Sequence, residues 1–319
     1  MTAYAGVTRL QATLAIVLGF CSCPAKAQTY INAERQPPEV STQMLVSTEW
    51  LSEHLSDADV LVLCVASDPA FYFHGHVPGA RLLTLKDIAV TRDSVPNQLP
   101  SSEQLKKAFE SAGASDLTRI VLYGERSGLL AAHAYWALDY LGVADHAALL
   151  DGGLEKWQAE GRSLSQETPA AVAGHLSLQI NPSVLVTAAE LEKMLHEKPN
   201  SITLLDARPT NEFSGEKLSE DATKAGHIPG AGSLYWKRNL ESTENPILLR
   251  DSELRAMYDD LGASEERPLI TYCRTGMQSS FDYFVAKYLG YNVRMYSGSF
   301  LDWSRKDLPV EGQQGTVHH

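Results

Sequence analysis

The segment PLITYCRTGMQSSFDYFVAKYL, residues 268–289, is the stretch from which the fold can be predicted. Its first residues form an apolar run of the kind found in a buried strand. A short loop follows from Cys273, and the remainder carries apolar residues at helical spacing, namely Phe281, Phe284, Val285 and Leu289. The segment therefore predicts a strand, a tight loop that starts with a cysteine, and a helix.

An earlier part of the chain repeats this pattern in the same order and with a nearly constant offset. The matched pairs are a capped helix start, a Gly-His-x-Pro-Gly-Ala turn, an apolar strand and a closing tryptophan. They are LVSTEWLSEHL (45–55) with LVTAAELEKML (185–195), GHVPGA (75–80) with GHIPGA (226–231), RIVLYG (119–124) with PLITYC (268–273), and Trp157 with Trp303. Ordered matches of this kind predict two homologous domains.

Short β-rich runs alternate with helical patterns inside each copy. Ser101-x-x-Gln104 and Thr187-x-x-Glu190 are typical of capping boxes, so each predicts the start of a helix. Alternating strands and helices predict an α/β fold in which each domain is a parallel sheet flanked by helices on both faces. We place the domains at 40–160 and 184–312, joined by a linker at 161–183 that mixes Ser, Pro and Ala without a regular period.

The composition is that of an ordinary globular protein. The chain has 319 residues, of which 44% are hydrophobic and 21% are charged, which is enough for two domains with cores of their own. The net charge is −12 and the isoelectric point is near 5.3. An acidic protein of this kind is not expected to bind nucleic acid or an anionic lipid surface through bulk charge.

The first residues are typical of a secretory signal peptide. An apolar stretch at 10–20 follows Arg9 and leads to Ala25-Lys26-Ala27, so we expect residues 1–27 to be removed and Gln28 to become the first residue. The stretch is too short to span a membrane, and Phe20 disfavours the alternative of a lipidated cysteine at position 21 or 23. The protein is therefore expected to be periplasmic or secreted, without a membrane anchor.

Two cysteines remain after removal of the signal peptide, so no disulfide framework is expected. Cys64 lies in the apolar run VLVLCVA at 60–66, where a buried, inert thiol is the simpler interpretation. Cys273 lies at a strand-to-helix turn, where loop N–H groups and the helix dipole favour the thiolate. Arg274 can orient an anionic substrate, and Gly276 permits the tight backbone path. Cys273 is therefore the predicted nucleophile, at a crevice between the domains.

Two other uses of a nucleophilic cysteine fit the sequence less well. A tyrosine phosphatase loop needs an arginine six positions after the cysteine, where this chain has Ser279. A papain-like protease needs a histidine base. The candidates, His76 and His227, lie in turns that occur in both domains, including the domain without a cysteine in its loop. We therefore expect a structural role for both histidines.

Together, these features make the chain resemble the tandem-domain rhodaneses, which are sulfurtransferases of the thiosulfate and 3-mercaptopyruvate type. The resemblance spans residues 40–310 and is carried by the paired turns, the CRTGMQ loop (273–278), LLDAR (204–208), DGGLEKW (151–157) and SGSFLDW (297–303). It implies that Cys273 takes the outer sulfur of a small anionic donor as a persulfide and passes it to a thiophilic acceptor such as cyanide. It also implies that no metal or organic cofactor is needed. Because Gly124 stands in the place of Cys273, the first domain is expected to be catalytically silent and to shape the cleft.

The resemblance further implies which residues bind substrate: Arg208 on the LLDAR strand, and the loop residues Arg274, Thr275, Gly276, Met277 and Gln278. Asp206 either orients Arg274 or anchors the end of its strand. A loop that begins Cys-Arg favours thiosulfate, since mercaptopyruvate enzymes usually carry Cys-Gly-Ser-Gly there. Two cations of the thiosulfate enzymes are missing, because Thr275 and Glu212 stand in their places. Cations that could compensate from neighbouring loops are Lys217, Lys224, Lys237 and Arg238.

The sequence thus predicts an exported thiosulfate sulfurtransferase and leaves three alternatives open. The first is a 3-mercaptopyruvate sulfurtransferase. The second is a non-catalytic persulfide carrier that hands its sulfur to an acceptor protein. The third is a structural tandem domain without chemistry, in which Cys273 would resist alkylation near neutral pH.

Overall fold

The computed structural model describes residues 1–3, 6, 40–170, 172–198 and 200–312. The chain divides into two units, residues 1–37 and 38–319, and the fold described below belongs to the second. Apart from residues 1–3 and 6, the predicted signal peptide lies outside the described residues. No helix among the described residues is long and apolar enough to cross a membrane.

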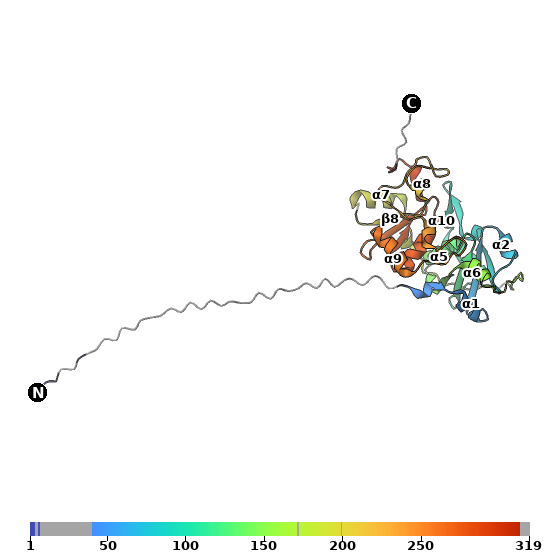
Figure 1. Cartoon of the computed structure of the whole chain (residues 1–319), viewed down its shortest axis with the longest axis horizontal. Helices are drawn as coiled ribbons and strands as arrows, with labels where there is room; N and C mark the ends of the chain where they lie inside the picture. The colour runs from blue at the N-terminus through green and yellow to red at the C-terminus, as the bar shows by residue number, and fades with distance from the viewer. Residues whose placement is uncertain (4–5, 7–39, 171, 199, 313–319) are drawn as a thin grey trace, which may run out of the picture. The chain divides into compact units, whose positions relative to one another are not determined.

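The first domain is built on a five-stranded parallel sheet (Figure 1). Its strands lie in the order β1 (Leu45–Val46), β7 (Ala147–Leu150), β6 (Arg119–Gly124), β2 (Val60–Ala66) and β3 (Arg81–Thr84). A separate antiparallel hairpin is formed by β4 (Val90–Arg92) and β5 (Val95–Gln98). The helices are α1 (Thr48–His54), α2 (Pro69–Phe73), α3 (Leu85–Ile88), α4 (Ser102–Ser111), α5 (Leu129–Leu141) and α6 (Gly153–Ala159), with 3-10 turns η1 (Thr42–Met44) and η2 (Ala144–His146).

The second domain repeats this plan with a four-stranded parallel sheet. Its strands lie in the order β11 (Val293–Met295), β10 (Leu269–Tyr272), β8 (Thr203–Asp206) and β9 (Gly232–Ser233). A parallel bridge from Leu185 to Met295 takes the place that β1 has in the first domain. The helices are α7 (Ala188–Glu197), α8 (Thr210–Phe213), α9 (Asp251–Asp260), α10 (Met277–Tyr288) and α11 (Ser299–Ser304), with 3-10 turns η3 (Pro182–Val184) and η4 (Trp236–Asn239).

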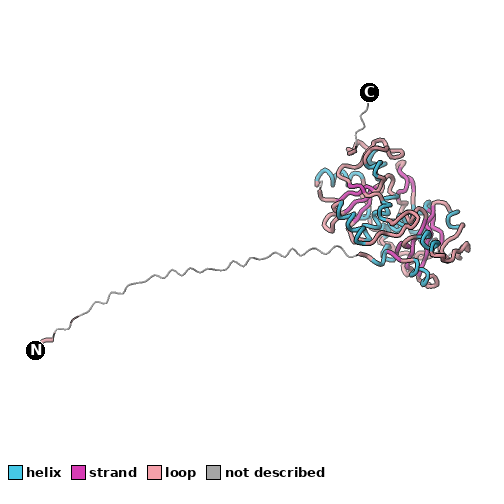
Figure 2. Tube along the Cα trace, in the orientation of Figure 1, coloured by secondary structure: helices cyan, strands magenta, loops and turns pink. Residues whose placement is uncertain are grey.

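The predicted fold class is confirmed, because two parallel sheets are each flanked by helices on both faces (Figure 2). The two predicted capping boxes are also present. Ser101 and Gln104 cap α4 reciprocally, and Thr187 and Glu190 do the same for α7.

The packing of the sheets follows the period of two expected of a strand. On β2, Leu61, Leu63 and Val65 point into one apolar cluster, whereas Val62 and Cys64 point into another on the opposite face. Burial raises the pKa of the Cys64 thiol to about 12, so this cysteine is inert as expected. The strand therefore serves two cores at once.

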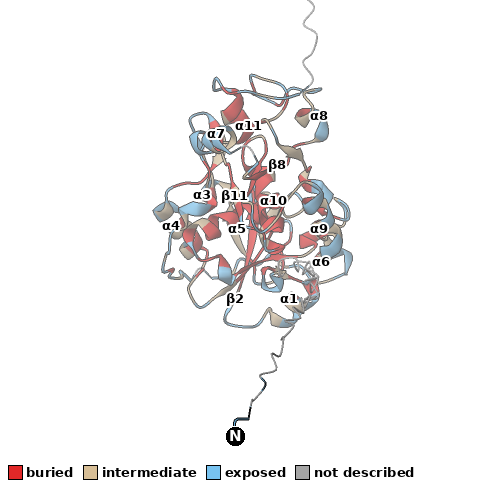
Figure 3. Cartoon of the chain, turned by 90° about the vertical axis from the view of Figure 1, so that its left-hand side faces the viewer, coloured by how far each residue is buried: buried red, intermediate tan, exposed pale blue. Residues whose placement is uncertain are grey.

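One of these cores is shared by the two domains. It contains α5 of the first domain and α10 of the second, and almost every residue of both helices is buried (Figure 3). The rings of Tyr135 and Phe284 meet edge to face, with centroids 5.0 Å apart. The domains are thus joined by a continuous apolar interior, which restricts their relative motion.

Residues 161–170 and 172–181, within the segment predicted as a linker, follow the surface of the first domain. Gly174 N–H donates to Glu110 O at 2.8 Å, and Asn181 N–H donates to Tyr140 O at 2.8 Å. Leu176 is buried beside them. The segment is therefore held to the first domain by its own backbone.

Both histidines of the repeated turns have structural roles, as predicted. The His76 ring stacks on Tyr72 at 3.7 Å, and its two nitrogens lie 3.0 and 3.1 Å from backbone carbonyl oxygens. The His227 ring stacks on Phe213 at 3.8 Å, and its Nδ1 lies 2.8 Å from Phe213 O. Each ring fastens its turn to the preceding helix.

A polar contact crosses the shared core. Asp139 on α5 accepts hydrogen bonds from Tyr283 Oη at 2.6 Å and from the ammonium of Lys287, both on α10. Its carboxylate is almost fully buried. Truncation would therefore leave a phenol and an ammonium without their partner at the domain boundary.

We predict that Asp139→Ala lowers the free energy of unfolding by about 2 to 3 kcal/mol. Urea unfolding at neutral pH measures this, with Asp145→Ala as the control because Asp145 lies on η2, outside the shared core. Equal stabilities of the two variants would show that the contact does not hold the domains together.

A second buried carboxyl lies on α10. Asp282 is fully buried, and its Oδ1 accepts a hydrogen bond from Asn239 Nδ2 at 2.7 Å. Burial, with a smaller effect of Asp206, raises the pKa of Asp282 well above its usual value. Burial in the folded protein therefore favours the neutral form of this carboxyl.

This pKa difference predicts a pH dependence of stability. Below the usual aspartate pKa of about 3.9, the carboxyl is neutral in both folded and unfolded states, so its stabilising effect is complete. As pH rises, only the unfolded state ionises, and stability is lost until the raised folded pKa is reached. Asp282→Asn should remove this loss of stability. As pH rises, the free energy of unfolding of the variant should therefore increase relative to that of the wild type by up to about 1.4 kcal/mol per pH unit. Urea unfolding across a pH series tests it, and a constant difference between the two proteins would contradict it.

Candidate active site

Cys273 directly follows β10, and α10 begins at Met277 after a three-residue loop. Gly276 caps the helix with a φ of 91°, and its N–H donates to Cys273 Sγ at 3.1 Å. The N-terminus of α10 therefore directs a backbone donor and its positive dipole end at the sulfur. The structure thus provides the donor geometry that the sequence predicts at Sγ, and the ionised state of the sulfur stays a prediction.

Only glycine fits at position 276. The positive φ strains any other residue, and a Cβ there would lie 2.8 Å from Ser297 O. The glycine thus lets the loop lie directly against the backbone at Ser297. A close approach of this kind sets the distance between the loop N–H and the sulfur.

The SGSFLDW motif at 297–303 supports the loop from behind. Cys273 N–H donates to Ser299 Oγ at 3.1 Å, and Phe300 N–H donates to Cys273 O at 2.9 Å. Leu301 N–H donates to Arg274 O at 3.0 Å. Ser299 adopts a φ of 57°, which turns its hydroxyl toward the loop. The sequence indicates this motif only as the end of a domain, and its role at the nucleophile was missed.

The first domain also contributes to the site, through the β4–β5 hairpin. Asn97 Nδ2 donates to Thr275 Oγ1 at 2.8 Å. Gln98 exchanges two hydrogen bonds of 3.0 Å with Ser297, one through its amide nitrogen and one through its amide oxygen. Neither Asn97 nor Gln98 was identified from the sequence. Asp93 and Ser94 both adopt positive φ in the turn of this hairpin, and only the position of the hairpin in the fold reveals its partner.

The surroundings of the sulfur correct one expectation. A groove of about 250 Å³ does lie between the domains, and among the residues that line it are Arg92, Gln98 and Ser297. Cys273 itself is only 1% exposed, however. Cys273 thus lies at the domain boundary but is covered, and a reagent can contact its sulfur only after neighbouring groups move. The loop residues Thr275 and Met277 are also buried, whereas Gln278 is partly exposed.

Arg274 forms an ion pair with Glu220, with 2.6 Å between Nη1 and Oε2. Both side chains reach solvent, with exposed fractions of 39% and 72%. Arg274 therefore follows Cys273 in the loop and has an accessible guanidinium. Its partner is Glu220, and the possibility that Asp206 orients it is excluded by the contacts that Asp206 makes instead.

Arg208 has a structural position, which corrects its predicted role in substrate binding. Its side chain is fully buried, and its Nε donates to Asp206 Oδ1 at 2.9 Å. Nη1 donates to Ser219 Oγ at 3.0 Å and Nη2 to Gly226 O at 2.8 Å. The guanidinium also lies 3.9 Å from the ring centroid of Phe300. With these partners, Arg208 anchors the end of β8 and has no donor facing a ligand.

The compensating cations suggested by the sequence add little near the loop. Lys224 Nζ donates to the backbone oxygens of Lys306 and Leu308 at 2.9 and 2.7 Å. Lys237 lies over the Trp236 ring, and Lys217 and Arg238 are exposed. Glu212, which stands in place of an expected arginine, is buried and accepts a hydrogen bond from Ser219.

The first domain confirms that Gly124 occupies the position equivalent to Cys273. Tyr123 Oη accepts from Val77 N–H at 3.1 Å, and Tyr272 Oη accepts from Ile228 N–H at the same distance. The residue after each tyrosine is therefore equivalent. A Cβ at Gly124 would lie 2.2 Å from Val65 O, so this position does not accept a cysteine without rearrangement.

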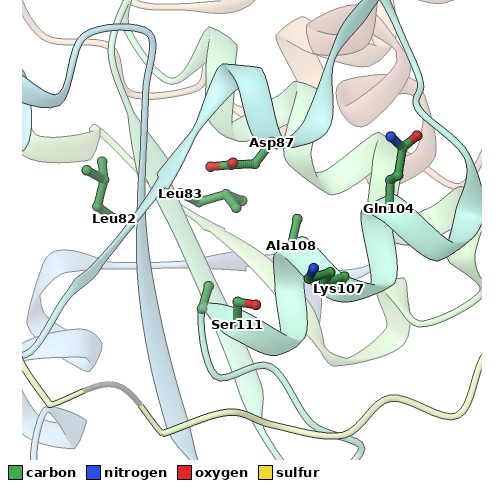
Figure 4. Close-up of a pocket in the computed structure, with 8 residues that line it drawn as sticks. Leu82, Leu83, Asp87, Gln104, Lys107, Ala108 and Ser111 are labelled. Carbon is green, nitrogen blue, oxygen red and sulfur yellow. The ribbon is translucent and has the colours of Figure 1, made fainter.

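A hollow of about 320 Å³ lies elsewhere on the first domain (Figure 4). The residues that line it come from or adjoin β3, α3 and α4: Leu82, Leu83, Asp87, Gln104, Lys107, Ala108, Ser111 and Ala112. None belongs to the cysteine loop or to the segments bonded to it. Among the described residues, no cluster of His, Cys, Asp or Glu is placed to hold a metal ion.

Comparison with known proteins agrees with this architecture. The family model for the rhodanese-like domain matches residues 47–160 and 187–306. The sulfur carrier protein TtuD of Thermus thermophilus is 36% identical over 274 residues, which cover 82% of this chain and 93% of TtuD. A thiosulfate sulfurtransferase of Pseudomonas aeruginosa is 33% identical over 256 residues, covering 80% and 92%.

Among solved structures, SseA from Escherichia coli, described with the 3-mercaptopyruvate sulfotransferases, matches with a TM-score of 0.71 and 27% identity. The match covers 80% of this chain and 98% of SseA. The chain therefore belongs to the rhodanese-like family and carries two such domains, and it is a member of the sulfurtransferase group of enzymes.

The close approach at Gly276 generates a prediction. Gly276→Ala should slow the alkylation of Cys273 by iodoacetamide about tenfold, since loss of about 1.4 kcal/mol from the N–H contact corresponds to that factor. Gly230→Ala is the matched control, because Gly230 also has a positive φ but a Cβ added to it would meet no atom within 4 Å. If both variants react at the wild-type rate, the contact does not activate the sulfur.

Proposed function

We propose that this protein is a thiosulfate sulfurtransferase that works through a persulfide on Cys273. The observation that carries the proposal is the Gly276 N–H directed at Sγ at 3.1 Å, at the start of α10 and next to an accessible Arg274. A backbone donor and a helix dipole stabilise the thiolate and, later, the terminal sulfur of the persulfide. The adjacent guanidinium can orient an oxyanion.

The reaction balances without an added oxidant or reductant. The Cys273 thiolate attacks the outer sulfur of thiosulfate, and the sulfur–sulfur bond of the donor breaks. Sulfite leaves with the electron pair, and the new bond leaves a persulfide on Cys273. An acceptor such as cyanide then attacks the outer persulfide sulfur, thiocyanate leaves, and the thiolate is restored. Two half-reactions of this kind predict ping-pong kinetics.

A persulfide carrier is the second candidate, and the burial of Cys273 favours it. A sulfur that is 1% exposed is protected from small molecules until a partner or a donor opens the site. The relative from Thermus thermophilus is itself named a sulfur carrier protein. A carrier would form the same persulfide but would turn over negligibly with small acceptors.

The proposal also includes export of the protein. Cleavage after Ala27 would leave Gln28 as the first residue, in a periplasmic or secreted product. Intact mass spectrometry of protein expressed with its own amino terminus reports this cleavage directly. An uncleaved chain would contradict the proposed localisation.

We predict that incubation with thiosulfate adds about 32 Da, the mass of one sulfur atom, and that Cys273→Ser abolishes both the adduct and thiocyanate formation. Cys64→Ser is the matched control, since Cys64 is buried on β2, and it should retain both. An active Cys273→Ser variant would refute the mechanism. An adduct without turnover of cyanide would identify the carrier, and a larger kcat/KM with 3-mercaptopyruvate than with thiosulfate would identify the alternative donor.

A further inference from the structure

The ion pair between Arg274 and Glu220 occupies the guanidinium that the proposed function assigns to the donor. Glu220 is the only carboxylate that the described residues place within ion-pair distance of Arg274. A carboxylate and the sulfonate-like end of thiosulfate are both oxyanions that accept hydrogen bonds from guanidinium N–H groups. The two anions therefore compete for the same donors.

The residues on either side of Glu220 are held by hydrogen bonds, so the backbone that carries its side chain has a defined position. Ser219 is buried and bonded to Arg208 and Glu212. Asp221 adopts a φ of 63°, and its carbonyl oxygen accepts from Arg305 Nη2 at 3.3 Å. The same arginine donates from Nη1 to Ser94 O at 3.0 Å, in the hairpin of the first domain.

We propose that Glu220 is an internal competing anion, which occupies Arg274 in the resting protein and lowers the affinity of the site for small anionic donors. The inference rests on the proposed function and names Glu220 as a residue that determines donor specificity. A donor that binds Arg274 must displace Glu220, whereas a neutral reagent that reaches Cys273 without using Arg274 does not. Glu220 thus disfavours anions relative to neutral molecules at the same sulfur.

The exposure of the pair sets the size of the effect. Ion pairs between solvent-exposed side chains are weak and are screened by salt. Release of Arg274 in Glu220→Gln should therefore lower the KM for thiosulfate about 2- to 5-fold and leave the saturating rate of persulfide formation unchanged. The gain should shrink as ionic strength is raised.

The experiment compares wild type, Glu220→Gln and Glu216→Gln in single-turnover persulfide formation. Glu216 is the matched control, because it is exposed on the same segment and its carboxylate forms no ion pair with the described residues. Glu220→Gln is expected to lower the KM, and Glu216→Gln is expected to behave as wild type. Equal KM values for all three proteins, or an equal decrease in both variants, would overturn the inference.

Alkylation of Cys273 separates a failure of this inference from a failure of the proposed function. Anionic iodoacetate and neutral iodoacetamide react with the same sulfur, and only the first competes with Glu220. Glu220→Gln should raise the iodoacetate rate about 2- to 5-fold and leave the iodoacetamide rate unchanged. An unchanged ratio of the two rates would refute the role of Glu220 even if the persulfide forms. A raised ratio of the iodoacetate rate to the iodoacetamide rate, without persulfide formation, would support the role of Glu220 and refute the thiosulfate reaction.

Discussion

The packing of α5 against α10 fixes how the two sheets lie against each other. These buried helices join the two sheets through one apolar core. Helix α5 begins after the loop that follows β6, and α10 begins after the loop that follows β10. Their contact brings the β4–β5 hairpin of the first domain to the cysteine loop of the second, where Asn97 and Gln98 bond to Thr275 and Ser297. The loop that holds Cys273 is therefore supported by both domains, although only the second domain carries the cysteine.

Because the domain is duplicated, a segment of the second domain contacts the first domain in the same way. The segment that runs from Leu240 to Leu248 corresponds to the hairpin, and it contacts the silent loop of the first domain. Leu248 N–H donates to Asp151 Oδ1 at 3.0 Å, and Ser127 Oγ donates to Thr243 O at 3.4 Å. Each domain thus supports the other's strand-to-helix loop. The silent loop has kept this scaffold, while the close approach of Val65 O to Gly124 leaves no space for a nucleophile.

The two arginines near the cysteine loop differ in their surroundings. Arg208 donates hydrogen bonds to Asp206, Ser219 and a backbone oxygen, so it holds the end of β8 and the loop at Ser219 in place. Arg274 is the guanidinium that remains accessible, and Glu220 shares it. The group directed at the sulfur itself is a backbone donor, the Gly276 N–H at the start of α10, rather than a charged side chain.

The duplicated α/β fold, the position of Cys273 at a strand-to-helix turn, the structural histidines and the two capping boxes could all be predicted from the amino-acid sequence. All of these depend on local periodicity, on turn chemistry or on matches along the chain. The sequence could not show that Arg208 is buried, that Glu220 pairs with Arg274 across 54 positions, or that Asn97 reaches Thr275 across 178 positions. These contacts form only in the folded protein, because partners so far apart in the chain are brought together by the packing of whole domains. The same packing covers the sulfur, whereas the local pattern predicts only that it can be ionised.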